Sequence, residues 1–157
     1  MAKYLSNETK WLGNVPLTPP GDEAYGGRPR VYRATISLDA LQLSSDVTKN
    51  VATGALITDT ISLGFIPSGM RFLRGMLNTS VSLGTSTIAI GNAATPGKYR
   101  AAAVFAAVDT ETPFGGTLVK AAVPAGAVEE LILTIGVATL PNTAGQKLVI
   151  DMEFVGP

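Results

Sequence analysis

The sequence contains no cysteine and no histidine. Without cysteine there is no disulfide framework and no thiolate metal site. Without histidine, the commonest general base and the commonest metal ligand are both missing. Catalytic triads, zinc sites and cysteine–histidine pairs are therefore excluded. We expect a protein that is not an enzyme and that has no cofactor, no metal and no small-molecule substrate.

Charge is scarce as well. Twelve lysines and arginines balance twelve aspartates and glutamates, and charged residues make up 15% of the chain, where an ordinary soluble domain has about 25%. The mean hydropathy is positive, +0.29. A neutral chain creates no field that would gather nucleic acid or an anionic membrane, so we expect neither as a partner. Much of the surface is expected to meet other protein.

Long apolar runs are missing too. The longest, residues 101–108, has eight residues, whereas a membrane-spanning helix needs about 18. The start of the chain has one lysine, Lys3, with no apolar run behind it, so we expect no signal peptide. These features predict a soluble protein that is not secreted by that route.

Residues 1–30 form a segment of their own, because prolines and glycines interrupt every short apolar stretch before it becomes periodic. We predict an extended N-terminal arm here and a single domain over residues 31–157. Trp11, the only tryptophan, lies in the arm and is interpreted as a docking anchor, since tryptophan buries a large area at low entropic cost. The residues predicted to make contact with a partner are Tyr4, Leu5, Trp11, Leu12, Val15, Leu17, Tyr25, Arg28 and Arg30.

From Val31 onward, apolar residues alternate with polar ones, as in strands with one buried face. The predicted inward positions are Tyr32, Ala34, Ile36, Leu38, Ile61, Leu63, Phe65, Ser86, Ile88, Ile90, Tyr99, Ala101, Ala103, Phe105, Leu131, Leu133, Ile135, Val137, Leu148, Ile150, Met152 and Phe154. The last two stretches, joined across residues 141–145, are predicted to form a hairpin. Residues 101–108 are also a helix candidate, because alanine favours helix. About eight short strands predict an all-β, antiparallel two-sheet sandwich of jelly-roll type.

Several clusters are candidate sites, and each has a simpler structural explanation. Asp151 and Glu153 share a strand face, but no third acid accompanies them, so we interpret them as a solvent face. Asp109 and Glu111 are interpreted as a polar loop, and Glu129 and Glu130 as a strand entrance with one acid exposed and the other at an interface or cap. A final set is predicted to make interface salt bridges: Arg71, Arg74, Lys98 and Arg100.

Two stretches, residues 63–73 (Leu-Gly-Phe-Ile-Pro-Ser-Gly-Met-Arg-Phe-Leu) and residues 84–99 with Pro96-Gly-Lys-Tyr, resemble small virion β-sandwich proteins of tailed bacteriophages. The similarity continues in residues 130–141 and 146–154. That family includes head decoration proteins and the bases of head fibres. The resemblance implies a jelly-roll-like fold, a homotrimer, and a place on the virion.

The first hypothesis is therefore a structural virion protein that cements the outer surface of a capsid by bridging subunits of the major capsid protein, after assembly in the host cytoplasm. The same resemblance fits a tail, adaptor or fibre-base component. A glycan-binding sandwich is a further alternative, although the sandwich has few aromatic residues to offer a sugar. A small hydrolase is disfavoured, because it needs two cooperating acids.

Overall fold

The computed structural model describes residues 3–5, 29–43, 46–50, 57–115, 123 and 126–156, and within these residues it contains strands and turns but no helix. The strands are β1 (Lys3–Leu5), β2 (Pro29–Ser37), β3 (Gln42–Leu43), β4 (Asp46–Asn50), β5 (Thr60–Ile66), β6 (Arg71–Thr79), β7 (Thr87–Gly91), β8 (Arg100–Val104), β9 (Thr112–Phe114), β10 (Glu129–Gly136) and β11 (Lys147–Val155).

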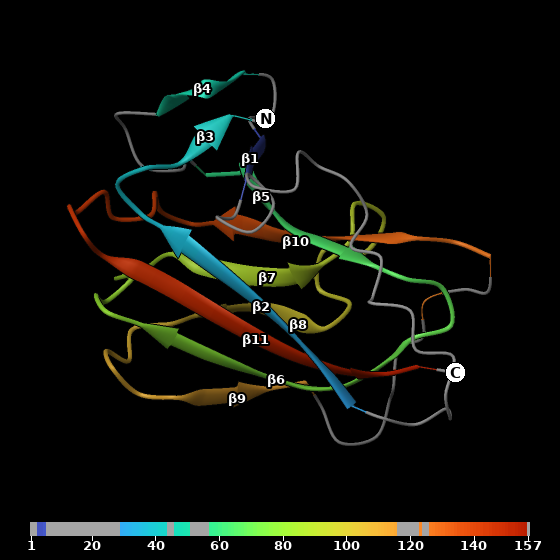
Figure 1. Cartoon of the computed structure of the whole chain (residues 1–157). Coiled ribbons are helices and arrows are strands. Elements are labelled where there is room, and N and C mark those ends of the chain that lie inside the picture. Colours follow the sequence, from blue (N-terminus) through green and yellow to red (C-terminus); the bar gives the residue numbers. More distant parts are fainter. Residues whose placement is uncertain are drawn as a thin grey trace.

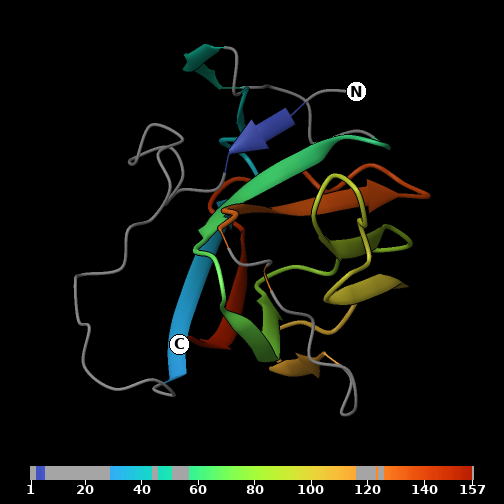
Figure 2. The same cartoon turned by 90° about the vertical axis from the view of Figure 1, so that its right-hand side faces the viewer.

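The strands form two sheets that pack face to face (Figures 1 and 2). One sheet has the order β4-β3-β1-β5-β10-β7-β8, and the other has the order β2-β11-β6-β9. If β2 and β5–β11 are numbered one to eight along the chain, they fall in the orders 2-7-4-5 and 1-8-3-6. This is the strand order of a jelly roll, two Greek keys folded into two sheets. The predicted all-β sandwich of jelly-roll type is thus confirmed.

The core lies between the sheets and follows the period-two pattern of the sequence. On β11, Leu148, Ile150, Met152 and Phe154 are all at most 1% exposed, and the residues between them are more accessible. Strand β11 has a neighbour on each side, because it pairs along its length with both β2 and β6. It is therefore an interior strand of its sheet, and its inward residues were all predicted correctly.

A β-bulge changes the pattern on β5. The pairing with β10 shifts between Leu131 and Ile132, so the partner of Leu131 is Gly64 and the partner of Ile132 is Ser62. Gly64 adopts a φ of 132°, which only glycine tolerates well. The bulge shifts the residues beyond it by one position, so Ile66 is fully buried and Phe65 is only partly buried. The prediction that Phe65 points inward is wrong for this reason.

The predicted hairpin of residues 131–137 with 148–154 is also wrong. Strand β10 pairs with β5 and β7, whereas β11 pairs with β2 and β6, so the connection crosses from one sheet to the other. In a jelly roll most consecutive strands lie in opposite sheets, and among β2 and β5–β11 only β7 and β8 pair as chain neighbours. Val137, predicted to be buried at the end of β10, is 69% exposed and has a φ of 67°.

Residues 101–108 do not form a helix. Strand β8 covers Arg100–Val104 and an irregular segment follows it. Phe105 is 3% exposed, as predicted, but Ala101 and Ala103 are exposed instead of buried. The alternation fails because β8 is the last strand of its sheet and the other sheet does not cover it.

Candidate interaction surfaces

The structure places three of the predicted arm residues. Tyr4 and Leu5 lie on β1, which runs parallel to β5 and antiparallel to β3, with Tyr4 opposite Ile61. Arg30 lies at the start of β2, opposite Phe154. The remaining residues of the set lie outside the described part of the chain: Trp11, Leu12, Val15, Leu17, Tyr25 and Arg28.

Two ion pairs occupy the outer face of the four-stranded sheet. Arg33 of β2 donates two hydrogen bonds to Asp151 of β11, both 2.7 Å long. Arg74 of β6 makes the same bidentate contact with Glu153, donating from Nε over 2.7 Å and from Nη2 over 3.0 Å. Each arginine stands directly opposite its acid in the register. Asp151 and Glu153 therefore belong to two cross-strand pairs on the solvent side, as predicted, and do not act as a pair with each other.

The electrostatic effect of the second pair is clear. The hydrogen bonds and the charge of Arg74 hold the pKa of Glu153 below its usual value, and Glu153 in turn raises the pKa of Arg74. An acid used as a proton donor needs the opposite shift. This face therefore has the chemistry of an ion-paired surface.

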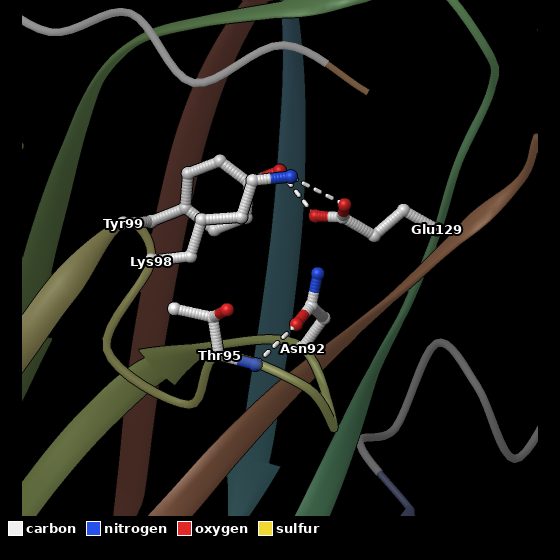
Figure 3. A network of polar contacts seen from close by, with 5 residues as sticks. All are labelled: Asn92, Thr95, Lys98, Tyr99 and Glu129. Atoms are coloured by element: carbon white, nitrogen blue, oxygen red, sulfur yellow. Dashed lines mark hydrogen bonds and ion pairs between the residues drawn. The ribbon is translucent and has the colours of Figure 1, made fainter. Parts of the chain in front are cut away.

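A buried polar network lies at the start of β10 (Figure 3). The Glu129 carboxylate, 8% exposed, forms an ion pair with the Lys98 ammonium group through one oxygen and accepts the Tyr99 hydroxyl through the other. Lys98 and Tyr99 end the connection between β7 and β8. Burial, followed by the hydrogen bond to Glu129, raises the pKa of Tyr99, so the hydroxyl stays protonated and remains a donor.

The loop below this network is held by its own short contacts. The Thr95 amide donates to Asn92 Oδ1 over 2.7 Å, and the Lys98 amide donates to the Thr95 carbonyl over 3.1 Å (Figure 3). The Tyr99 ring packs edge-on against Phe72 and Phe154 of the other sheet, with centroids 5.0 and 5.7 Å away. The network therefore joins the β7–β8 connection to β10, and the ring joins it to the second sheet.

Three residues of the predicted basic set have partners within the chain. Arg74 and Lys98 form their ion pairs within the chain, with Glu153 and Glu129. The Arg100 guanidinium group donates to the backbone carbonyls of Ile88 and Ala103, and its burial lowers its pKa. The fold therefore already supplies partners to these three residues, and the salt bridges to another protein stay a prediction.

An uncharged surface lies at the open β8 edge of the seven-stranded sheet. We call it the β8 surface and define it as the exposed residues Ala101, Ala102, Ala103, Val104, Ala106, Ala107 and Val108. Val104 is 52% exposed and Val108 43%. A single exposed alanine needs no explanation, but five alanines and two valines in one exposed segment form an apolar patch, and such a patch on a protein surface indicates a contact site.

The described residues offer little to a small ligand. A cavity between the sheets has a volume of about 10 Å³, room for at most one water molecule; its lining residues are Tyr32, Arg33, Ala34, Leu63, Leu131, Ile150 and Met152. No group of three acidic side chains in the described part of the chain is arranged to hold a metal ion. Within the same residues, no helix is long and apolar enough to cross a membrane.

By its strand order, this is a jelly-roll protein. No protein-family model and no curated protein matches its sequence. Solved structures do resemble it, and three of them are chains of bacteriophage capsids. A chain in the capsid of Ralstonia phage GP4 gives a TM-score of 0.63 at 14% identity, and the match covers 99% of both chains.

The other two matches are similar. A chain of the cyanophage Pam1 capsid asymmetric unit gives a TM-score of 0.60 at 18% identity and covers 91% of this chain and 94% of that one. A chain of the acidic stable capsid of Helicobacter pylori bacteriophage KHP30 gives 0.53 at 12% identity, covering 85% and 91%. At these identities the likeness establishes a shared fold.

Two of these features were missed by the sequence analysis. Residues 101–108 were noted as an apolar run, but the absence of charge over eight residues also fits an exposed contact surface. Of Glu129 and Glu130, one acid was expected to be exposed and the other to lie at an interface or a cap, and Glu129 is instead a buried partner of Lys98 and Tyr99. No spacing in the sequence connects residue 129 with residues 98 and 99.

Proposed function

We propose that this protein is a structural component of a tailed-bacteriophage particle that decorates the capsid and cements it by bridging subunits of the major capsid protein. The observation that carries the proposal is the end-to-end correspondence with chains from three phage capsids. In each match, more than nine-tenths of the other chain is covered. The correspondence is thus between chains of similar length, and does not pair this chain with one domain of a much longer chain.

The surface chemistry supports a structural and non-enzymatic role. The acids that the structure describes on the outer face are bound to arginines, and the buried acid Glu129 is bound to Lys98 and Tyr99. Such a surface suits protein contacts better than proton transfer. The proposal includes a homotrimer on the outer surface of the shell, because a symmetric oligomer meets several shell subunits at once.

The protein would act by thermodynamic linkage between its own binding and the assembly of the shell. A protein that binds the assembled shell more tightly than loose shell subunits stabilises the assembled state by the free energy of that preferential binding. Several weak contacts made by one oligomer act together, because after the first contact the others form at a high effective concentration. No chemical step is required, and a rigid, fully packed sandwich is the appropriate scaffold.

The glycan-binding alternative is less well supported. A flat sugar site needs exposed aromatic rings, and in the described residues the large exposed apolar side chains are one isoleucine and five valines. The aromatic side chains whose burial the structure describes are buried or partly buried: Tyr32, Phe65, Phe72, Tyr99, Phe105, Phe114 and Phe154.

The test is to add the purified full-length chain to phage shells that were assembled without it. We expect saturable co-sedimentation with the shells and a higher temperature of shell disruption. Purified tails from the same phage serve as the comparison. Binding to tails and not to shells would favour a tail or adaptor component, and binding to neither would refute the proposal.

A further inference from the structure

The β8 surface has features that go beyond exposure. All four residues of β8 after Arg100 are exposed, so side chains are accessible on both faces of the strand. Within the described part of the chain β8 has one neighbouring strand, β7. A strand that is apolar on both faces and covered on neither is unfavourable for an isolated soluble protein. Something is therefore expected to cover it.

The exposed segment is held in a defined conformation. Before β8, the Tyr99 amide donates to the Ile90 carbonyl over 2.9 Å, and the Tyr99 ring is buried. After β8, the buried Phe105 accepts from the Leu83 amide at 3.3 Å, and the Asp109 amide donates to Thr79 over 2.8 Å. A surface fixed at both ends loses little conformational freedom when it binds, which favours association.

The geometry of the strand favours contact through side chains over addition of a further strand. The pairing of β8 with β7 shifts between Ile88 and Ile90, so a bulge interrupts the ladder. The Arg100 guanidinium group fills this irregular region by donating to the carbonyls of Ile88 and Ala103. Bulges at sheet edges twist the strand and hinder edge-to-edge pairing. Small alanine side chains, by contrast, allow another surface to approach closely.

The charge pattern identifies the partner. Residues 101–108 contain no charged residue, and Arg100 and Asp109 bracket them. A residue close to a symmetry axis lies beside its own copies, so a charge there would meet a like charge, which lowers the affinity. A contact with a different protein has no such restriction and commonly uses charges for steering. An uncharged, small-residue surface therefore fits a second copy of itself.

We propose that the β8 surface is the contact between copies of this chain, with the surfaces of the copies facing one another around a symmetry axis. The inference extends the proposed function, because it assigns the oligomer contact and leaves the rest of the molecule for the shell. It predicts that one residue, Val104, lies near its own copy in the oligomer.

The test is sedimentation of the full-length chain at micromolar to tens of micromolar concentration. We expect the wild type to be an oligomer and Val104→Lys to raise the dissociation constant roughly 100-fold or more, because like charges are brought together. The matched control is Val31→Lys. Val31 is a valine of similar exposure, 60%, on β2 of the other sheet, and this variant should remain an oligomer. Thermal melting of both variants checks that the fold is intact.

A mixing experiment separates contact between copies from a change in folding. Val104→Lys and Val104→Glu should each be monomeric, and an equal mixture should associate again, because opposite charges then meet. A wild type that is monomeric throughout this range, a Val104→Lys variant that stays oligomeric, or a mixture that stays monomeric would each overturn the inference.

Binding to shells distinguishes this inference from the proposed function. If Val104→Lys remains oligomeric but no longer binds shells, the β8 surface faces the capsid, so the inference fails and the proposed function stands. If the wild type forms the oligomer through Val104 but never binds shells, the inference stands and the proposed function fails.

Discussion

Tyr99 donates its hydroxyl to the carboxylate of Glu129, 30 positions later in the chain, and Lys98 binds the other oxygen of the same carboxylate. The acid is buried, and its two partners come from one connection between neighbouring strands. A buried charge is tolerated only when it is paired and hydrogen-bonded. This contact therefore fixes the connection that leads directly into β8, and it makes the position of the β8 surface depend on Glu129.

Glu129→Ala should destabilise the protein by about 3 kcal/mol, because it leaves the ammonium group of Lys98 and the hydroxyl of Tyr99 without their acceptor. Tyr99→Phe removes one donor and keeps the ring in the core, so its cost should be smaller, about 1 kcal/mol. Urea unfolding of the two variants measures the difference. A smaller loss for Glu129→Ala than for Tyr99→Phe would show that the ion pair contributes nothing.

Gly91→Ala should destabilise the same region by about 2 kcal/mol. A Cβ at Gly91 would lie 2.1 Å from the Thr95 carbonyl oxygen and 2.5 Å from that of Pro96, and these backbone atoms cannot rotate away. The matched control is Gly97→Ala, where the nearest atom, of Ala101, is 3.4 Å away. We expect that variant to be within about 0.5 kcal/mol of wild type. Equal melting temperatures for the two variants would contradict the tight packing at Gly91.

Ile135→Asp should prevent folding, because Ile135 is 1% exposed on β10, between β5 and β7, and an unpaired carboxylate there has no compensating partner. Thr134→Asp is the control one position away on the opposite, more accessible face of the strand, and its effect should be far milder. Circular dichroism during heating compares the two. Similar losses would mean that the register of β10 is wrong.

Arg74→Ala should raise the pKa of Glu153 toward the ordinary glutamate value of about 4.3. In the folded protein Arg74 lowers this pKa, so the pair stabilises the fold above the ordinary value, and that contribution is lost as the pH falls through the folded value. Titration of the Glu153 carboxyl carbon by NMR follows the change, with Arg33→Ala as the control on the other pair. An unchanged midpoint in Arg74→Ala would show that the pair does not persist in solution.

Trp11→Ala should weaken binding to shells without changing thermal stability, if the arm is the attachment device that the sequence predicts. A deletion of residues 1–30 is a less clean test, because it also removes β1 and the first two residues of β2. Co-sedimentation with shells measures the effect of the single substitution. If Trp11→Ala binds shells as well as the wild type does, Trp11 is not part of the attachment surface.

The fold class was predictable because it depends on local pattern. Alternation on residues 148–154 and 32–38 gave the inward faces correctly, since a strand places successive side chains on opposite sides whatever its neighbours are. The residues Pro67-Ser68-Gly69 favour a turn by local chemistry as well, because proline fixes φ and glycine tolerates a positive one, and Gly69 has a φ of 78°. The partner of each strand was not predictable, and the predicted β10–β11 hairpin was wrong because these consecutive strands, like most in a jelly roll, belong to different sheets.

The sequence by itself determined what this protein lacks and which residues alternate: no histidine or cysteine chemistry, little charge, and inward faces on most strands. Only the tertiary structure decided that a bulge buries Ile66 in place of Phe65. It also decided that Glu129 is buried beside Lys98 and Tyr99, and that residues 101–104 stay exposed. The physical reason is the same in each case. Burial depends on which strand lies alongside and whether the opposite sheet extends over it, and those contacts join residues far apart in the chain.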